Sequence, residues 1–520
     1  MRIKQIGFVL GVVLFLLVLS IPTMDVFYTT AQQLIAEHHA SIDAEHLANS
    51  IQAVLAVLLL MVVWWLTEAV PLPATALLPA ILFPLLKVVG IHGNTPYEFT
   101  AKNTLLNYSN PVIFLFLGGF LLAAAMQKWK LDRRFTLWFL TRGKLANDSR
   151  TVLLGIMATT AIISMWISNT ATAAMMLPLG LGVLSFMGAE PGHSRYGTCI
   201  MLGIAWAASI GGVGTIIGTP PNGIALGILN STFGSDPTYR GISFLDWMKF
   251  GIPYVLLFLP VAWTVLLRLY PPEIISLPGG KERLLEERST LGPLSRGEKG
   301  TITVFALAVT LWVTNPFWEH LLPSSFYSQL LWLDEYSIGL LCGVLLFFVP
   351  VNFSQGRFLL DWRDTKLVDW GTLILFGGGI ALSDAMFKSG LAAWIATSFV
   401  GLVGTPSTLL MVIAVVFLVN FLTEVTSNTA VTSMMVPVVI SIAVKTGENP
   451  ITLAVSATIA ASLGFMLPVA TPPNALVYGT GYIPLKHMVR AGLVLDILGW
   501  LVTVFTIVVI AGQLWGIVSI

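Results

Sequence analysis

Ser168-Asn-Thr-Ala-Thr-Ala-Ala-Met-Met-Leu-Pro178 recurs in this chain as Ser427-Asn-Thr-Ala-Val-Thr-Ser-Met-Met-Val-Pro437. Each copy opens with three polar residues at the centre of an otherwise apolar stretch, 151–187 in the first case and 406–445 in the second. Serine, asparagine and threonine are favoured at helix N-termini, because their side-chain oxygens accept hydrogen bonds from free backbone N–H groups. We therefore predict a helical hairpin in each stretch, with the Ser-Asn-Thr motif at its tip.

Two further pairs of segments repeat in the same order along the chain. Residues 116–126 resemble 376–386, and Thr219-Pro-Pro-Asn222 recurs as Thr471-Pro-Pro-Asn474. Three matches in one order at nearly one spacing indicate an internal duplication. Paired broken segments in two repeats of opposite orientation are typical of secondary transporters, whose binding site lies at the repeat interface.

The two Thr-Pro-Pro-Asn segments predict broken helices within 197–230 and 451–482. Proline lacks the backbone donor and disfavours helical geometry in the residue before it, so each segment should free carbonyl oxygens. A simple proline kink is the structural alternative. Unwound carbonyls near the middle of a membrane are suitable ligands for sodium.

Composition places the chain in a lipid bilayer. Of its 520 residues, 56% are hydrophobic and 10% are charged, and its mean hydropathy is +0.84. A water-soluble protein needs more charge on its surface. In the bilayer core every backbone group must be paired, so membrane-spanning helices are expected. The predicted spans are 6–24, 51–69, 72–90, 110–128, 251–270, 301–319, 336–352, 368–388 and 491–518, together with the two broken helices, and an amphipathic segment at 131–142 should lie along the interface.

The distribution of basic residues favours one topology. If both Ser-Asn-Thr segments are re-entrant hairpins, most of the 27 Lys and Arg residues fall on the side of the N-terminus. Basic residues concentrate in cytoplasmic loops, so that side is predicted to be the cytoplasm. The resulting all-α fold has eleven transmembrane helices and two re-entrant hairpins in two inverted repeats, in a bacterial-type inner (plasma) membrane, with the C-terminus outside. Its predicted parts are a first helix and external loop (1–50), a first repeat (51–270), a cytoplasmic loop (271–300) and a second repeat (301–520).

The hairpin tips have the chemistry to bind an anion. Free N–H groups and the positive end of the helix dipole attract negative charge at a helix N-terminus. Two tips, one from each repeat, can hold two carboxylates of one small molecule. Neither tip has a neighbouring lysine or arginine, so the remaining negative charge would require mobile cations.

Three carboxylates within or near the spans carry less weight. For Glu68, a hydrogen bond to a helix end is at least as good an interpretation as a functional role. Glu424 has the alternative role of bracing its hairpin. Asp384, near the end of a span, is expected to be solvated. Buried ionisable groups in membranes are nevertheless functional candidates by default.

These residues resemble the divalent-anion/sodium symporter family, which includes dicarboxylate, citrate and sulfate transporters. The resemblance covers most of the chain and rests on Trp64-Trp-Leu-Thr-Glu-Ala-Val-Pro-Leu-Pro73, both Ser-Asn-Thr motifs and both Pro-Pro-Asn motifs. It implies a homodimer, in which a scaffold domain holds a transport domain that moves as an elevator. It also implies that sodium ions are co-transported without an organic cofactor, and that the chain is not an enzyme and does not bind nucleic acid.

The resemblance also implies two sodium sites and one substrate site, and Asn169 and Asn428 would contact both ion and substrate. The first sodium site would use Ser164, Ser168, Asn169 and the backbone of Gly218. The second would use Thr423, Thr426, Asn428 and the backbone of Ala470. The substrate would meet Ser168, Asn169, Thr170, Thr219, Ser427, Asn428, Thr429 and Thr471.

Sodium symport of C4-dicarboxylates (succinate, malate, fumarate) is the function that these features favour. A sodium-independent dicarboxylate antiporter and a sodium-coupled sulfate symporter remain alternatives. An intramembrane protease is disfavoured, because the sequence has neither a His-Glu-x-x-His nor a Gly-x-Ser-x-Gly motif. An anion channel is disfavoured too, since two broken hairpins suit alternating access better than a continuous pore.

Overall fold

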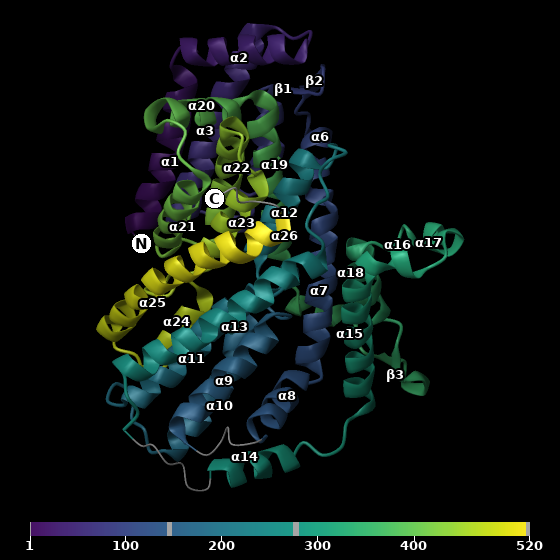
Figure 1. Cartoon of the computed structure of the whole chain (residues 1–520), viewed down its shortest axis with the longest axis vertical. Helices are drawn as coiled ribbons and strands as arrows, with labels where there is room; N and C mark the ends of the chain where they lie inside the picture. The colour runs from purple at the N-terminus through teal and green to yellow at the C-terminus, as the bar shows by residue number, and fades with distance from the viewer. Residues whose placement is uncertain (1, 143–147, 274–279, 516–520) are drawn as a thin grey trace.

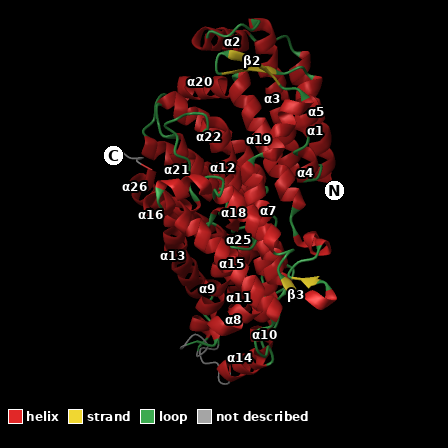
Figure 2. Ribbon diagram, turned by 90° about the vertical axis from the view of Figure 1, so that its right-hand side faces the viewer, coloured by secondary structure: helices red, strands yellow, loops and turns green. Residues whose placement is uncertain are grey.

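The computed structural model describes residues 2–142, 148–273 and 280–515, which are mostly helical (Figures 1 and 2). The N-terminal part contains α1 (Arg2–Ser20), α2 (Asp25–His38), α3 (Ala44–Thr67), α4 (Leu72–Thr75), α5 (Leu78–Leu85), β1 (Val89–His92), β2 (Thr95–Glu98), α6 (Ala101–Leu105) and η1 (Leu106–Ser109). The first set of matched segments forms α7 (Pro111–Lys128), α8 (Leu131–Leu140), α9 (Ser149–Ser164), α10 (Asn169–Phe186), α11 (Arg195–Gly212), η2 (Ile216–Gly218), α12 (Pro220–Phe233) and α13 (Phe244–Leu269).

The second half follows the same order after a connecting region. That region contains α14 (Gly280–Ser289), α15 (Arg296–Thr314), η3 (Asn315–Phe317), α16 (Trp318–Leu321), α17 (Ser324–Leu330), α18 (Glu335–Leu345), β3 (Pro350–Asn352), η4 (Phe353–Gln355), β4 (Arg357–Phe358) and η5 (Trp362–Leu367). The second set of matched segments forms α19 (Trp370–Ser389), α20 (Leu391–Val403), α21 (Thr408–Thr423), α22 (Asn428–Thr446), α23 (Pro450–Ala460), α24 (Pro472–Tyr478), α25 (Leu485–Thr506), the π-helical turn η6 (Ile507–Ala511) and α26 (Gly512–Trp515).

A contact between matched residues relates the two halves. The rings of Phe116 in α7 and Phe376 in α19 occupy equivalent repeat positions, and their centroids lie 4.8 Å apart. Contact between a residue and its own equivalent is the mark of a two-fold relation. Gly223 in α12 lies against both rings, and a Cβ there would come within 2.2 Å of Phe116 and 2.8 Å of Phe376.

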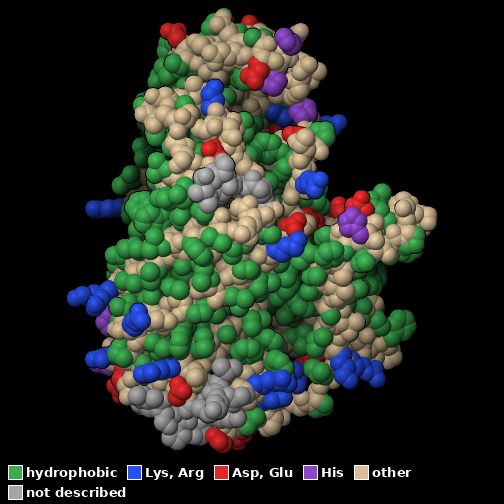
Figure 3. Space-filling view, viewed as in Figure 1, with side chains coloured by type: hydrophobic (Ala, Val, Ile, Leu, Met, Phe, Trp, Pro, Cys, Tyr) green, Lys and Arg blue, Asp and Glu red, His purple; other side chains and the backbone are tan. Residues whose placement is uncertain are grey.

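Length and hydropathy mark eight of the described helices as candidate membrane spans, or nine if a bent pair counts as one span. That pair is α20 and α21, which meet at 109°. Apolar side chains cover the middle of the face in Figure 3, and Lys and Arg gather toward its lower end, near α8 and α14.

Two predicted spans are shorter in the structure. The segment 72–90 breaks between α4 and α5, which contain prolines 73, 79 and 84, and it then enters the antiparallel hairpin β1–β2. The segment 336–352 ends its helix at Leu345 and continues into the small hairpin β3–β4 (Figure 2). The amphipathic segment predicted at 131–142 is α8, as expected.

Small residues bring α7 and α18 close together. A Cβ on Gly118 of α7 would lie 2.0 Å from the Gly339 carbonyl oxygen of α18, and Gly343 packs against Gly118 one turn further on. Such contacts stabilise helix pairs in membranes, where close van der Waals packing drives association.

Candidate functional site

The tip of the first hairpin lies between α9 and α10. Ser168 caps α10, and its Oγ accepts a hydrogen bond from Ala171 N at 3.3 Å. Ser164 Oγ lies 2.9 Å from Asn169 Oδ1 and 2.7 Å from the Ala208 carbonyl oxygen of α11. The Ser164 hydroxyl has one proton and two acceptors within reach. The side-chain oxygens of Ser164 and Asn169 therefore lie close together at the hairpin tip.

The second hairpin repeats this arrangement between α21 and α22. Thr423 Oγ1 lies 2.7 Å from Asn428 Oδ1 and 2.8 Å from the Ala461 carbonyl oxygen. Thr423 therefore corresponds to Ser164, and Asn428 to Asn169. Ser427 differs from Ser168, because its side chain makes no capping hydrogen bond to α22.

Each broken helix is tied by the asparagine of its Thr-Pro-Pro-Asn motif. Asn222 Nδ2 donates to the carbonyl oxygens of Gly212 (3.1 Å) and Thr215 (2.8 Å). Asn474 Nδ2 donates to those of Gly464 and Leu467, both at 3.0 Å. Both asparagines are fully buried. The two amides therefore fix the unwound segments that precede α12 and α24, a role that the sequence did not reveal.

The first tip and the first break touch each other. Asn169 Nδ2 lies 3.5 Å from Thr219 Oγ1. Gly212 leaves room for the asparagine, because a Cβ there would come within 2.4 Å of Asn169 Oδ1. In the second half Thr471 caps α24, and its Oγ1 accepts a hydrogen bond from Asn474 N at 3.3 Å.

The predicted residues differ in exposure. Ser168, Asn169, Ser427 and Asn428 are half-buried and Thr170 is exposed, so both tips reach open space. The remaining predicted residues are buried: Ser164, Gly218, Thr219, Thr423, Thr426, Thr429, Ala470 and Thr471. Thr426 uses its hydroxyl outside the tip, donating to the Trp65 carbonyl oxygen of α3 at 3.1 Å.

The two halves of the site are packed into one another. Helix α10 of the first hairpin packs against α24 of the second broken helix, and α22 of the second hairpin packs against α12 of the first. Each hairpin is thus held by the broken helix of the other repeat. Among the described residues, no hydrogen bond joins the Ser-Asn-Thr residues of one tip to those of the other.

Most of the chain matches a known protein family. A family model described as the sodium:sulfate symporter transmembrane region matches residues 43–520. The chain belongs to this family. The match confirms the resemblance to the divalent-anion/sodium symporters, which are membrane transporters and not enzymes.

Relatives of this chain agree with it over most of their length. A protein of Staphylococcus saprophyticus named sodium-dependent dicarboxylate transporter SdcS is 38% identical over 474 residues, covering 89% of this chain and 87% of its own. A Staphylococcus aureus protein of the same name is 36% identical, with 89% and 86% covered.

Two solved structures share the fold of this chain. The YdaH transporter of Alcanivorax borkumensis matches with a TM-score of 0.54 and 16% identity, covering 88% of this chain and 99% of that one. MtrF of Neisseria gonorrhoeae matches with a TM-score of 0.53 and 13% identity, covering 86% and 96%.

The three carboxylates singled out from the sequence have different roles in the structure. Glu424 braces its hairpin as anticipated, since it accepts hydrogen bonds from three backbone N–H groups of the second broken helix. Glu68 forms an exposed ion pair with Lys4 at 3.4 Å. The expectation for Asp384 is wrong: its side chain is buried, because Lys388 one turn away in α19 neutralises it at 2.7 Å.

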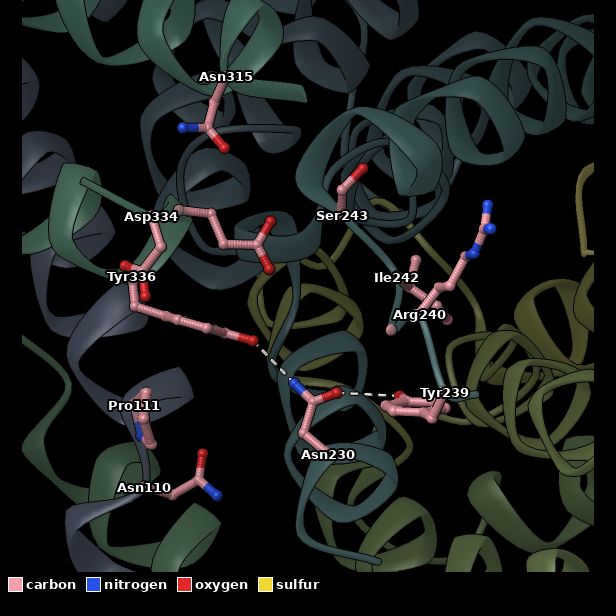
Figure 4. A pocket seen from close by; sticks show the side chains of 12 residues that line it. Asn110, Pro111, Asn230, Tyr239, Arg240, Ile242, Ser243, Asn315, Asp334 and Tyr336 are labelled. Carbon is pink, nitrogen blue, oxygen red and sulfur yellow. Dashed lines mark hydrogen bonds between the residues drawn. The ribbon is translucent and has the colours of Figure 1, made fainter. Parts of the chain in front are cut away.

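A separate cavity of about 500 Å³ lies outside the hairpin tips (Figure 4). The start of α7, the end of α12 and the segments before α13 and α18 line it. Asn230 bridges two tyrosines there, donating to Tyr336 Oη (2.8 Å) and accepting from Tyr239 Oη (2.9 Å). None of the predicted site residues lines this cavity.

Proposed function

We propose that this protein is a symporter that imports C4-dicarboxylates (succinate, malate, fumarate) together with sodium ions. The matched pairs Ser164–Asn169 and Thr423–Asn428 carry the proposal. In each pair the hydroxyl group has one proton but lies within hydrogen-bonding distance of two acceptors, a backbone carbonyl oxygen and the amide oxygen. When the proton bonds the carbonyl, the hydroxyl and amide oxygens face each other without a donor. A sodium ion between them would satisfy both.

The two ion sites then follow the sequence expectation. The first would use Ser164, Ser168, Asn169 and the Gly218 backbone, and the second Thr423, Thr426, Asn428 and the Ala470 backbone. All these ligands are oxygens, the donor type that hard cations prefer. The bonds of Asn222 and Asn474 support the carbonyl ligands by holding the unwound segments in place.

The substrate carboxylates would lie between the tips, each at the N-terminus of a half-helix. We assign their contacts to Ser168, Asn169, Thr170, Thr219, Ser427, Asn428, Thr429 and Thr471. The half-burial of Asn169 and Asn428 suits a residue with an ion on one side and substrate on the other. Ion and substrate would then share a side chain, which is a direct route for coupling.

We further propose eleven spans and two re-entrant hairpins, a cytoplasmic N-terminus, an external C-terminus and a homodimer. Movement would be of the elevator type. Helices α8 and α20 support this, because each follows a matched helix, α7 or α19, and precedes a hairpin. They would act as arms between scaffold and moving parts.

The test is radiolabelled succinate uptake into proteoliposomes under an inward sodium gradient, compared with potassium or choline. We expect uptake that requires sodium and is inhibited by malate and fumarate. Uptake that ignores sodium but rises with internal dicarboxylate would make the protein an antiporter. Sodium-driven uptake of labelled sulfate that unlabelled sulfate inhibits and succinate does not would make the protein a sulfate symporter. Sulfate is the substrate named in the family's description.

Gly218→Ala is expected to raise the half-saturating sodium concentration about tenfold or more. The new Cβ would lie 2.5 Å from the Gly212 carbonyl oxygen and 3.0 Å from that of Met165, so the backbone at residue 218 must shift. A shift of about 1.4 kcal/mol in ion binding corresponds to tenfold. The measurement is initial uptake rate against sodium concentration.

Gly182→Ala is the matched control for this glycine. It lies in α10 with nothing within 4 Å of an added Cβ, and we expect wild-type sodium dependence. If the two variants showed the same sodium dependence, the proposal that the Gly218 backbone binds sodium would be refuted.

A further inference from the structure

The helices of this chain pack as two groups. The hairpin group contains both hairpins, both broken helices and the helices α13 and α25. The scaffold group contains α1, α3, α7, α15, α18 and α19. The groups meet where α12 and α22 pack on α19, where α12 packs on α7 and where α13 packs on α15. In the proposed elevator movement the hairpin group slides past the scaffold group, so contacts between their facing side chains must break.

A carboxylate joins the two groups at the start of α13. Glu335 is the first residue of α18, and its Oε2 accepts a hydrogen bond from the backbone N–H of Phe244, the first residue of α13, at 2.7 Å. The N–H groups of a first helical turn have no partner within their own helix, and the helix dipole stabilises negative charge there. Hydrogen bonds to a carboxylate are also stronger than those between neutral groups. This bond therefore holds α13 to α18 across the boundary between the groups.

Trp312 of α15 adds a second contact from the scaffold side. Its indole Nε1 donates to the Glu335 carbonyl oxygen at 2.9 Å, and its ring stacks on that of Phe244 with centroids 4.5 Å apart and planes 8° from parallel. Phe244 and Trp312 are both 1% exposed. One tryptophan thus holds the residue that carries the carboxylate and covers the ring of the residue that the carboxylate binds.

Aromatic rings extend this contact to the tip of the first hairpin. Trp166, two residues before Ser168, stacks on Phe244 with centroids 6.3 Å apart, and it meets Phe305 of α15 edge-to-face at 5.2 Å. Such ring pairs contribute more than their buried area alone. The tip that we propose to bind sodium therefore contacts the scaffold group through the same Phe244 that Glu335 binds.

The second repeat shows that the matched helix forms without such a carboxylate. Gly251 of α13 and Gly492 of α25 each pack against the unwound segment of their own repeat, and the two helices begin at equivalent positions, Phe244 and Leu485. Among the described residues, no side chain accepts a hydrogen bond at the start of α25, where Pro484 precedes the helix. The bond at Phe244 is therefore a tie between the groups and not a requirement for the helix.

We propose that Glu335 and Trp312 form a clasp on the start of α13, which stabilises the conformation described here against movement of the hairpin group. The clasp deepens the proposed function and rests on it, because the movement is that of the same tips. Neither residue belongs to the proposed ion or substrate sites. Loss of a hydrogen bond to a carboxylate should shift the equilibrium away from this conformation about tenfold or more.

The experiment measures the separation of the two groups directly. Asn94→Cys, in the turn between β1 and β2, and Lys445→Cys, near the end of α22, would carry spin labels for pulsed electron paramagnetic resonance in nanodiscs. Both positions are exposed, whereas the native Cys199 and Cys342 are buried, so labelling should be specific. Strand β1 packs on α19, so the first label reports on the scaffold group. We expect Glu335→Ala to raise the population of a second distance, relative to the wild-type distance, about tenfold or more.

Two further substitutions in the clasp and one control sharpen this test. Glu335→Gln keeps an uncharged acceptor for Phe244 N and should give a smaller shift than Glu335→Ala. Trp312→Leu removes the ring stack and the indole donor, and should shift the distances in the same direction. Glu319→Ala is the matched control, because Glu319 is an exposed glutamate of α16, in the same connection between α15 and α18. It should leave the distances unchanged.

The clasp and the proposed symport can fail separately. Wild-type distances in both Glu335→Ala and Trp312→Leu would overturn the clasp, as would an equal shift in Glu319→Ala. Sodium-driven succinate uptake by the wild-type protein would leave the symport standing in that case. A shift in Glu335→Ala, together with wild-type uptake that ignores sodium, would refute the symport and support the clasp.

Discussion

Asn169→Ala and Asn428→Ala should each abolish sodium-driven uptake, with a loss of about a hundredfold or more. Each substitution removes an oxygen that converges with Ser164 or Thr423 and an amide that can donate to a substrate carboxylate. A hydrogen bond to a charged group is worth about 1.5–3 kcal/mol. Losing the ion ligand and the substrate donor together should therefore lower the uptake rate about a hundredfold or more. The measurement is succinate uptake in proteoliposomes at matched protein content.

Folding must be separated from function in this experiment. Both variants should insert and elute as wild type in size-exclusion chromatography, because neither asparagine supports a helix interior. Asn94→Ala, in the exposed turn between β1 and β2, is the control and should transport normally. Near-normal uptake by both tip variants would refute the site.

Asn222→Leu and Asn474→Leu are expected to have the second largest effect. Leucine is larger than asparagine and has no donor, so each unwound segment loses two hydrogen bonds to buried carbonyl oxygens; those of Thr215 and Leu467 keep one backbone donor each, whereas those of Gly212 and Gly464 lose the amide that pairs them. Each unpaired buried group costs about 1–3 kcal/mol, so we expect half-saturating sodium to rise about 10- to 100-fold and the melting temperature to fall.

Asn230→Leu is the matched control for this pair. Asn230 lies in α12, as Asn222 does, and its amide also makes two hydrogen bonds, but to Tyr239 and Tyr336 in the separate cavity. We expect Asn230→Leu to lower the melting temperature without changing the half-saturating sodium concentration. If it raised half-saturating sodium as much as Asn222→Leu, the effect could not be attributed to the unwound segment.

The sequence predicted the parts of the site that depend on local chemistry. Polar residues inside apolar stretches identified both hairpins, and proline pairs identified both broken helices; α10 and α22 begin at Asn169 and Asn428 as expected. Glu424 as a brace could also be anticipated, because a carboxylate beside a tip needs donors.

Features that depend on tertiary contacts were not predictable in this way. Helix α20 is apolar throughout, so nothing in its sequence distinguishes it from the spans on either side, and only its 109° angle to α21 separates it. Asp384 looked solvated because the pairing with Lys388 requires the helix to be in place.

The packing of each hairpin against the broken helix of the opposite repeat, in addition to its own, has a consequence for how the protein could be divided. Helices α10 and α22 each pack on an element from the opposite half, so neither half can complete its own binding surface. Two polypeptides separated within the 271–300 connection would have to find each other to work. The same packing constrains how the two repeats can diverge in evolution. A substitution in the broken helix of one repeat changes the surface on which the hairpin of the other repeat packs.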